Sequence, residues 1–440
     1  MASIAGSLGR IRADLESYLP SERIEAACSA VGHTWRQRVF GPAVTLHLFL
    51  VQVIWSNTAM AHLRHLAGNV VAAPAYCRAR MRLPLAALAV LLRRSADDVR
   101  PDASERWCGL RAVLVDGSST ITLDTPSCQK TFGQPTGCKP GCGFPVPKVL
   151  ALFDAFTGMI VEMMAFPLYT HEQSKVWMLD LRLGAGDLLV GDRGFCSFAH
   201  LAMLMERGVH GLFRCHQKQI VDFRANRKTG GKGKPKSRFI RRLGKHDQIV
   251  EWKRPGAKPK WMSIEQWAAL PQTLLLRELR YSLPCDGRRT RSVTIVTTLL
   301  DAELYPREKV AALYGVRWTV ETHFAELKTT LKMRKLKSTT PEGVLKELIA
   351  YSLVYNLVHA VMRKAAARQG VTPDRISFID TIRWLLTAAA DAELPDLVVN
   401  PRRPGRHQPR VTKDRQDTYP KMCRPRSVLR KELKTPAKTA

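Results

Sequence analysis

Residue types suited to phosphate chemistry recur at helical spacing between positions 314 and 328. Tyr314, Arg317, Glu321 and Lys328 follow the pattern Y-x2-R-x3-E-x6-K. At about 100° per residue they fall within an arc of about 60° on one helix, provided that Gly315 does not interrupt it. An apolar stripe lies about 100° round the same helix and contains Val320, Phe324, Leu327 and Leu331. One stripe is therefore expected to pack into a core, and the other to present a carboxylate beside two cations and a phenol.

The plainer interpretation of this helix is a solvated face with an ion pair between Arg317 and Glu321. Such a pair contributes only about 0.2–0.5 kcal/mol. Two carboxylates upstream favour a functional interpretation, because Asp116 and Asp192 each end an apolar run typical of a buried strand. Catalytic and ligand-binding residues commonly follow the carboxyl ends of strands in α/β sheets. Asp-Gly, as at 116–117, is also an ordinary turn signal.

Three carboxylates from two strands and a helix could hold two Mg²⁺ ions, since Mg²⁺ prefers oxygen ligands. Two ions about 3.5–4 Å apart would activate a water or a 3′-hydroxyl and stabilise the leaving oxygen of an in-line displacement. A carboxylate cluster with cations beside it in a basic chain suits phosphodiester chemistry on nucleic acid.

The elements that must position these residues begin with a helical segment, 1 to about 105. Apolar spacing predicts helices at Ser7–Tyr18, Val44–Ala67 and Leu83–Arg94, separated by Gly68-Asn69 and Ala73-Pro74. Few acids accompany its arginines, which include Arg64, Arg78, Arg80, Arg82, Arg93 and Arg94. The segment fits a small DNA-binding unit or a solvated basic bundle equally well.

Short apolar runs then alternate with helical patterns, which indicates a mixed α/β sheet. Strands are expected at Arg111–Asp116, Val149–Phe153, Met159–Phe166, Asp187–Gly191 and His210–Arg214, and helices at Gln173–Leu183 and Phe198–Arg207.

A basic, β-rich segment separates the second aspartate from the glutamate. Residues 214–260 contain 16 Lys+Arg against three acids, with a flexible loop at 228–236. Strand-like runs follow at Gln248–Trp252, Leu274–Tyr281 and Arg291–Thr298. Helical periodicity returns at Pro306, and a further helix is predicted from Thr340-Pro341-Glu342 to Gly370. The tail, 401–440, has 13 Lys+Arg against three acids and is expected to be largely unstructured alone.

The overall composition restricts the class of protein. The 440 residues carry a formal net charge of +31, which favours nucleic acid as a partner. A membrane carrier is not expected, because the best candidate run, Val44–Trp55, is shorter than the roughly 18 residues of a span and contains His47 and Gln52. A hydrophobic content of 45% excludes a disordered polycation. The N-terminus lacks a signal-peptide pattern, and the ten cysteines are best interpreted as reduced thiols in a cytoplasmic protein.

One cysteine cluster leaves two interpretations open. Cys128, Cys138 and Cys142 lie in a Gly/Pro-rich stretch without the paired spacing of zinc ligands. A plain loop is the simpler interpretation, and a structural zinc site is the alternative.

The order Asp116, Asp192, Glu321, with the Y-x2-R-x3-E-x6-K signature, resembles the DDE transposases of the insertion-sequence-four family. The signature matches at all four positions. Asp116-Gly-Ser-Ser and Gly191–Phe195 resemble the two aspartate motifs of that family, and Ala75–Pro84 is similar to an N-terminal segment of many members. The resemblance spans about 75 to 360.

This resemblance implies an RNase H-like catalytic core interrupted by a β-rich insertion, within an α/β fold class. It implies cut-and-paste transposition through hairpinned ends, with Asp116, Asp192 and Glu321 catalytic and metal-binding. Tyr314, Arg317 and Lys328 would grip DNA phosphates. The implied cofactor is Mg²⁺, as two ions with Mn²⁺ as a substitute, and the implied partners are double-stranded terminal inverted repeats, target DNA and a second copy in a homodimer. A tryptophan of the insertion stacks on a flipped base in relatives; the candidates here are Trp252, Trp261 and Trp267.

We therefore expect five segments, in a chain working in the cytoplasm on the bacterial nucleoid. They are a helical DNA-binding domain, 1–105; the first part of the core, 106–215; the insertion, 216–300; the glutamate helix, 301–338; and a C-terminal helix with a basic tail, 339–440. Two rival functions remain: a domesticated DNA-binding protein without catalysis, and an RNase H-like nuclease without strand transfer.

Overall fold

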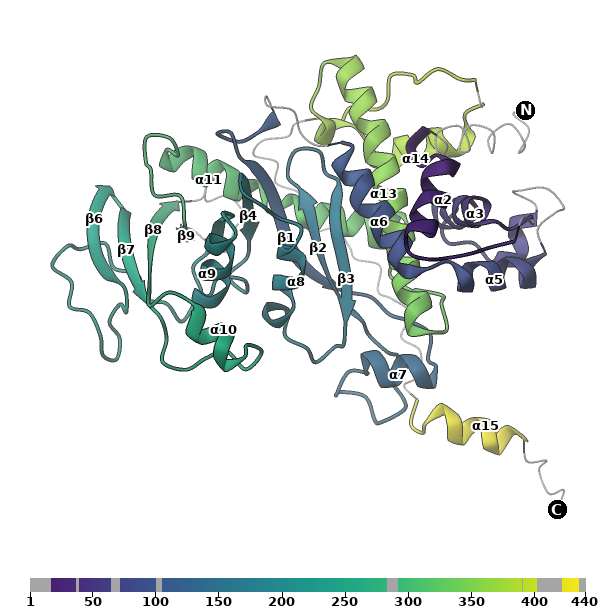
Figure 1. Ribbon diagram of the computed structural model, residues 1–440, viewed down its shortest axis with the longest axis horizontal. Helices are drawn as coiled ribbons and strands as arrows, with labels where there is room; N and C mark the ends of the chain where they lie inside the picture. The colour runs from purple at the N-terminus through teal and green to yellow at the C-terminus, as the bar shows by residue number, and fades with distance from the viewer. Residues whose placement is uncertain are drawn as a thin grey trace.

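A computed structural model describes residues 17–36, 39–64, 72–99, 105–282, 292–389, 391–401 and 422–434. Within these residues one nine-stranded sheet runs through the molecule, with helices on both faces (Figure 1). The strand order is β3-β2-β1-β4-β5-β9-β8-β7-β6. Three neighbouring strands, β1, β4 and β5, are parallel, and the remaining pairs are antiparallel. The mixed α/β class predicted from the sequence is confirmed.

The strand bounds follow the predicted apolar runs closely. They are β1 (Arg111–Ser119), β2 (Lys148–Asp154), β3 (Ile160–Phe166), β4 (Asp187–Gly191), β5 (His210–Arg214), β6 (Arg238–Gly244), β7 (Asp247–Lys253), β8 (Thr273–Ser282) and β9 (Ser292–Thr297). Strand β6 was not predicted, because its side chains are mostly exposed and show no apolar run. The strands of the basic segment extend the same sheet, because β9 pairs with β5.

Alternating residues of β1 face two different hydrophobic clusters. Ala112 and Leu114 pack with the buried helix α13 (Pro341–Gln369), together with α3 (Pro42–Ile54) and α6 (Leu85–Asp97). Val113 and Val115 pack with α8 (Val176–Asp180) and α9 (Phe198–Glu206), and Trp267 of α10 (Ile264–Ala269) packs against that same cluster. Successive side chains of a strand point to opposite faces, so burial on both faces explains the continuous apolar run.

The N-terminal helices differ from the prediction in two places. The helix predicted at Val44–Ala67 ends at Ile54, where Ser56 and Asn57 adopt positive φ. The Ala73-Pro74 pair does not separate helices but opens α5 (Ala73–Arg82), because proline is tolerated in the first turn. The helix α2 (Ser21–Ala30) precedes them, and most of the helix predicted at Ser7–Tyr18 lies outside the described residues.

Helix α13 confirms its predicted boundaries. The Thr340 hydroxyl accepts from the Gly343 amide at the N-terminus, and Gly370 ends the helix with φ 63°. By length and composition α13 could cross a membrane, and it is longer than the run considered in the sequence analysis. However, 89% of its most apolar stretch is buried within the protein, as in a core helix.

Two further helices differ from what the sequence predicts. Only Val176–Asp180 of the predicted helix Gln173–Leu183 is α-helical, after a 3₁₀ turn at Glu172–Ser174. In the tail, residues 426–434 form α15 (Arg426–Lys434), a helix that was not predicted from the sequence. Arg426 lies 3.5 Å from Asp124, just before α7 (Pro126–Phe132), which places α15 at one end of the molecule (Figure 1). Residues 402–421 and 435–440 are outside the described part.

Candidate active site

Asp116 and Asp192 occupy equivalent positions on adjacent parallel strands. The pairing of β1 with β4 ends with Val115 opposite Gly191. Asp116 and Asp192 are the next residues after these two in the sequence. Adjacent strands lie about 4.8 Å apart. Asp116 continues the face of Leu114, and Asp192 follows two residues after Val190; both apolar residues belong to the α13-side cluster. The two carboxylates therefore start from one face of the sheet.

The prediction that Asp116 ends its strand is wrong, whereas Asp192 does follow the last residue of β4. Strand β1 continues to Ser119, because β2 still pairs with it antiparallel from Ala151 to Lys148. The apolar run of β1 stops at Val115, which is also the last residue that pairs with β4.

Arg317 brings positive charge to this pair of aspartates. Its guanidinium Nη1 lies 3.6 Å from Oδ2 of Asp116, and its side chain is only 7% exposed. The group also lies 4.3 Å from the centre of the Trp318 ring, so stacking holds it in place. Burial raises the pKa of Asp116, and the charges of Asp192 and Glu172 add to this, while the Gly117 amide and Arg317 oppose it.

The signature residues do not lie on one continuous helix. Helix α11 (Arg307–Val316) ends before Arg317, α12 (Thr319–Ala325) carries Glu321, and a π-helical turn spans Glu326–Thr330. Between them the amides of Arg317, Val320 and Glu321 bond to carbonyls three residues back. These tighter and wider turns interrupt the regular 100° periodicity, so the expectation of a single continuous helix is wrong. The apolar stripe is nevertheless buried as predicted.

Glu321 is exposed on α12, and α12 packs onto the sheet beside the aspartates. The ring of Phe324 meets that of Phe153 edge-on at 5.4 Å, and Phe153 lies on β2 next to β1. Asp116 and Asp192 are thus adjacent, with Glu321 on the helix that covers the same face.

Tyr314 and Lys328 are less exposed than the helical wheel predicted. Tyr314 is 2% exposed, and its hydroxyl has no hydrogen-bond partner in the described part of the chain. Burial raises its pKa, while Arg317 lowers it and Asp192 raises it, so the phenol lies within the field of the candidate site. Lys328 is half-buried, and burial lowers its pKa, with Arg334 adding to the effect.

A fourth carboxylate, Glu172, was missed by the sequence analysis. A Cβ atom on Gly117 would lie 2.7 Å from Oε1 of Glu172, so glycine at 117 leaves the space that this carboxylate occupies. Glu172 reaches the site from the 3₁₀ turn after β3, and nothing in its sequence context marks it.

A buried pair supports the turn that carries Asp192. The ring nitrogens of His200 lie 2.8 Å from the Phe195 carbonyl oxygen and 2.9 Å from Oδ2 of Asp180. Burial would lower the pKa of His200, but Asp180 outweighs it and raises the pKa. The Phe195 amide in turn donates to the Asp192 carbonyl. His200 therefore ties the segment after Asp192 to the rigid helix α9.

The other predicted ligands and stacking residues do not gather at this site. Among the described residues, one group of side chains has metal-ligand atoms that all lie within 4.8 Å of one another: His323, Glu326 and His359. This group does not include Cys128, Cys138 or Cys142. Trp252 is buried, and its Nε1 donates to Glu278 at 3.0 Å. Trp261 and Trp267 are partly buried against the same core.

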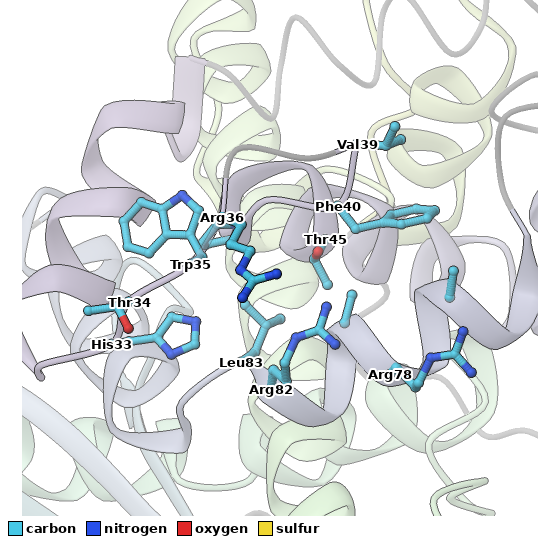
Figure 2. A pocket seen from close by; sticks show the side chains of 13 residues that line it. His33, Thr34, Trp35, Arg36, Val39, Phe40, Thr45, Arg78, Arg82 and Leu83 are labelled. Carbon is cyan, nitrogen blue, oxygen red and sulfur yellow. The ribbon is translucent and has the colours of Figure 1, made fainter.

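A basic cleft of about 710 Å³ lies among the N-terminal helices (Figure 2). Arg36 enters it from the loop before α3, and Arg78 and Arg82 enter it from successive turns of α5. Among the residues that the structure describes, no acidic residue lines the cleft, and these three side chains have no hydrogen bond or ion pair. The stacked rings of His33 and Trp35, 5.9 Å apart, form another wall.

A sequence model of the family described as "Transposase DDE domain" matches residues 107–357, more than half of the chain. The chain belongs to this transposase family. The matched segment of this DDE transposase runs from just before β1 into α13 and includes Asp116, Asp192 and Glu321.

The transposase is also 27% identical over 373 residues to "Transposase InsG for insertion sequence element IS4" of Escherichia coli (strain K12). The alignment covers 80% of this chain and 78% of the relative. The resemblance to the insertion-sequence-four family is confirmed. Among solved structures, a cryo-EM structure of the piggyBac transposase synaptic complex with hairpin DNA aligns with a TM-score of 0.43 and 11% identity, covering 86% of this chain and 80% of that one.

Proposed function

We propose that this DDE transposase carries out cut-and-paste transposition of an insertion sequence, with Asp116, Asp192 and Glu321 as the catalytic, metal-binding residues. The register of β1 and β4 carries the proposal, since it sets the two aspartates side by side on the face covered by α12. The five strands β1 to β5 with their covering helices support an RNase H-like core, which the strands of the basic insertion extend.

The donor set fits a divalent metal ion. All three residues, and the nearby Glu172, offer carboxylate oxygens, the ligands that Mg²⁺ prefers. Burial raises the pKa of Asp116, and the charges of Asp192 and Glu172 add to this rise. A cation relieves that crowding of negative charge. When bound, two Mg²⁺ ions, or Mn²⁺ in their place, would supply the activation of a water or 3′-hydroxyl nucleophile.

The remaining signature residues of the chain are proposed to position DNA. Arg317 orients the Asp116 carboxylate through its ion pair, and its Nε has no hydrogen-bond partner in the described part of the chain. Its guanidinium is proposed to donate to a DNA phosphate. The unpaired Tyr314 hydroxyl offers a further donor, and Lys328 adds a cation from the π-helical turn. The three thus hold the scissile phosphate next to the carboxylates.

DNA binding is proposed to involve three surfaces, with the protein acting as a homodimer on double-stranded ends and target. The N-terminal cleft reads the terminal inverted repeats, while the basic insertion and tail add salt-dependent backbone affinity. A second cleft, of about 1090 Å³, lies in the insertion and supports the same role. Seven Lys and Arg line it: Arg224, Arg227, Lys228, Lys234, Arg242, Lys245 and Arg280.

The direct test of the function combines purified protein, Mg²⁺, supercoiled target DNA and a duplex carrying the inverted repeat that flanks the gene. Excised ends joined to the target are the expected product. Nicked ends without joined product would instead support the nuclease, and binding without any cleavage would support the domesticated DNA-binding protein.

The proposed role of the N-terminal cleft in DNA binding can be tested separately. Arg78→Ala combined with Arg82→Ala is expected to weaken binding to end DNA by roughly 10- to 100-fold at about 0.1 M salt, because two phosphate contacts are lost. The plot of log affinity against log salt should become shallower by about 2. Fluorescence anisotropy over a salt series measures both.

The matched control removes the same charge from exposed positions on other helices, with Lys364→Ala and Arg383→Ala. It should leave the slope unchanged. Arg80 is unsuitable, because it lies 3.6 Å from the Phe49 ring and donates to Gln52, so its loss would disturb packing. An unchanged slope in the Arg78/Arg82 variant would remove the cleft from the DNA interface.

A further inference from the structure

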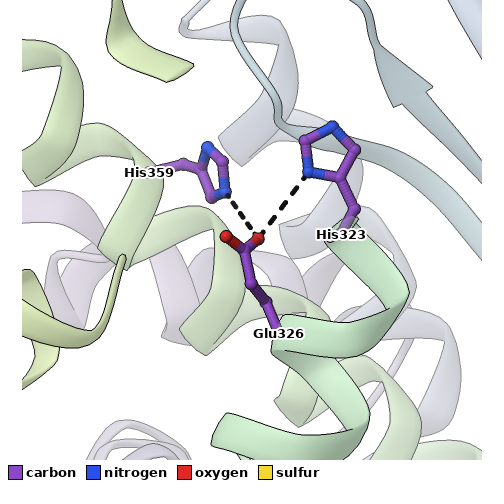
Figure 3. A group of neighbouring side chains, drawn as sticks. All are labelled: His323, Glu326 and His359. Carbon is purple, nitrogen blue, oxygen red and sulfur yellow. Dashed lines mark ion pairs between the residues drawn. The ribbon is translucent and has the colours of Figure 1, made fainter. Parts of the chain in front are cut away.

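A cluster of metal-ligand type side chains lies behind α12, outside the candidate catalytic site. His323 comes from α12, Glu326 from the start of the π-helical turn, and His359 from α13 (Figure 3). One ligand atom of each lies within 4.8 Å of the others. The transposase chemistry proposed above uses none of the three.

The separations within this cluster suit a small tetrahedral ion. Oε2 of Glu326 lies 3.7 Å from Nδ1 of His323 and 3.8 Å from Nε2 of His359. The Tyr355 hydroxyl lies 2.8 Å from that Nδ1 and 3.0 Å from that Oε2. Bonds of about 2.0–2.1 Å place tetrahedral ligands about 3.3–3.4 Å apart. The two separations between Glu326 and the histidines are a few tenths of an ångström longer than this, so small side-chain movements bring them to the spacing of a bound ion.

His359, on α13, lacks hydrogen-bond partners in the described part of the chain. Its side chain is 6% exposed, and neither ring nitrogen has a hydrogen-bond partner in the described part of the chain. The Glu326 carboxylate is too distant for a hydrogen bond at 3.8 Å. Buried polar atoms are normally satisfied, so an orphaned imidazole aimed at a carboxylate points to a ligand between them.

The surroundings fix both imidazole rings in orientation. Phe153 stacks on His323 with centroids 5.1 Å apart, and Phe378 lies 5.8 Å from His359. Gly158, at φ 72°, makes room for the second ring, since a Cβ there would lie 2.4 Å from its Nδ1. An aromatic shell of this kind holds ligands in place and limits access of water.

We propose that His323, Glu326 and His359 bind one Zn²⁺ ion, with the Tyr355 hydroxyl donating a hydrogen bond to the Glu326 carboxylate beside it. Two imidazoles and a carboxylate are a donor set that zinc uses, whereas Mg²⁺ takes oxygen ligands. The site therefore selects a different ion from the catalytic carboxylates. It joins the end of the glutamate helix to the buried helix α13, and so fixes the position of α12 over the sheet. The inference does not rest on the proposed function.

The test is zinc binding by the full chain after treatment with a chelator, followed by dialysis and elemental analysis. An Asp192→Asn background reduces binding at the catalytic carboxylates. One Zn²⁺ per chain is expected, with a rise in Tm of about 3–6 °C when free zinc exceeds the Kd about 100-fold. Mg²⁺ at the same concentration should produce no such rise.

His359→Ala and Glu326→Gln should each abolish the retained zinc and the Tm shift. The control is His210→Asn, because His210 bonds to Thr298 in the sheet and lies outside the cluster; it should keep both. Co²⁺ offers a measurement without any variant, since a tetrahedral nitrogen and oxygen site gives strong visible absorption. A wild-type chain that shows no zinc, no Tm shift and no tetrahedral cobalt spectrum would overturn the proposal, as would full zinc binding by the His359 variant.

Discussion

Glu321→Gln is expected to cut end DNA at least about 10³-fold more slowly than the wild type while binding it with unchanged affinity. Glutamine keeps the shape of the side chain but removes the charge that a metal ligand needs. Since the Glu321 side chain is exposed, stability should not change. Single-turnover cleavage of a labelled end, next to an anisotropy titration, separates the two effects.

The matched control for this variant is Glu308→Gln, an exposed glutamate in the first turn of α11. It should cleave at the wild-type rate. Cleavage retained by Glu321→Gln within about tenfold would contradict the assignment of Glu321 as a metal ligand.

Arg277→Met is expected to lower the free energy of unfolding by about 3–5 kcal/mol. Arg277 is fully buried on β8, and its Nε and Nη2 atoms bond to Asp247 at 2.8 and 2.5 Å. Its Nη1 donates to the Tyr305 carbonyl at 2.7 Å, just before α11 begins. The variant leaves Asp247 buried without its partner and releases the segment that leads into the signature helices. Urea unfolding followed by circular dichroism measures the change.

The double variant Arg277→Met with Asp247→Leu is the control for this effect. Replacing a buried ion pair by apolar residues is often close to neutral, so it should recover most of the lost stability. A loss below about 1 kcal/mol in the single variant would show that the pair does not hold the insertion to the core.

Local chemistry was sufficient to predict the parts of the fold that depend on neighbours in sequence. Strand β4 and the Asp192 that follows it appear as an apolar run ended by a charge. The ends of α13 follow from a threonine cap and a glycine with positive φ. These features need no knowledge of distant segments.

Periodicity in the sequence could not predict two aspects of the candidate site. These are the places where the backbone departs from a regular helix, and the residues that come from segments distant in sequence. The tight turns around Arg317 and the π-helical turn at Glu326 rotate the signature residues relative to one another. Glu172 approaches Gly117 only because β3 and its following turn fold beside β1 and β2. His359 meets His323 across 36 positions of sequence because α13 packs against the sheet with α12.

The most direct test of the central claim is the number of Mn²⁺ ions bound by the complex of the transposase with its end DNA, measured by electron paramagnetic resonance of the free ion. About two ions per active site are expected in the wild type, and weaker or fewer ions in Asp116→Asn, Asp192→Asn and Glu321→Gln. Equal numbers and affinities in all four proteins would contradict the proposal that these carboxylates hold the catalytic metal.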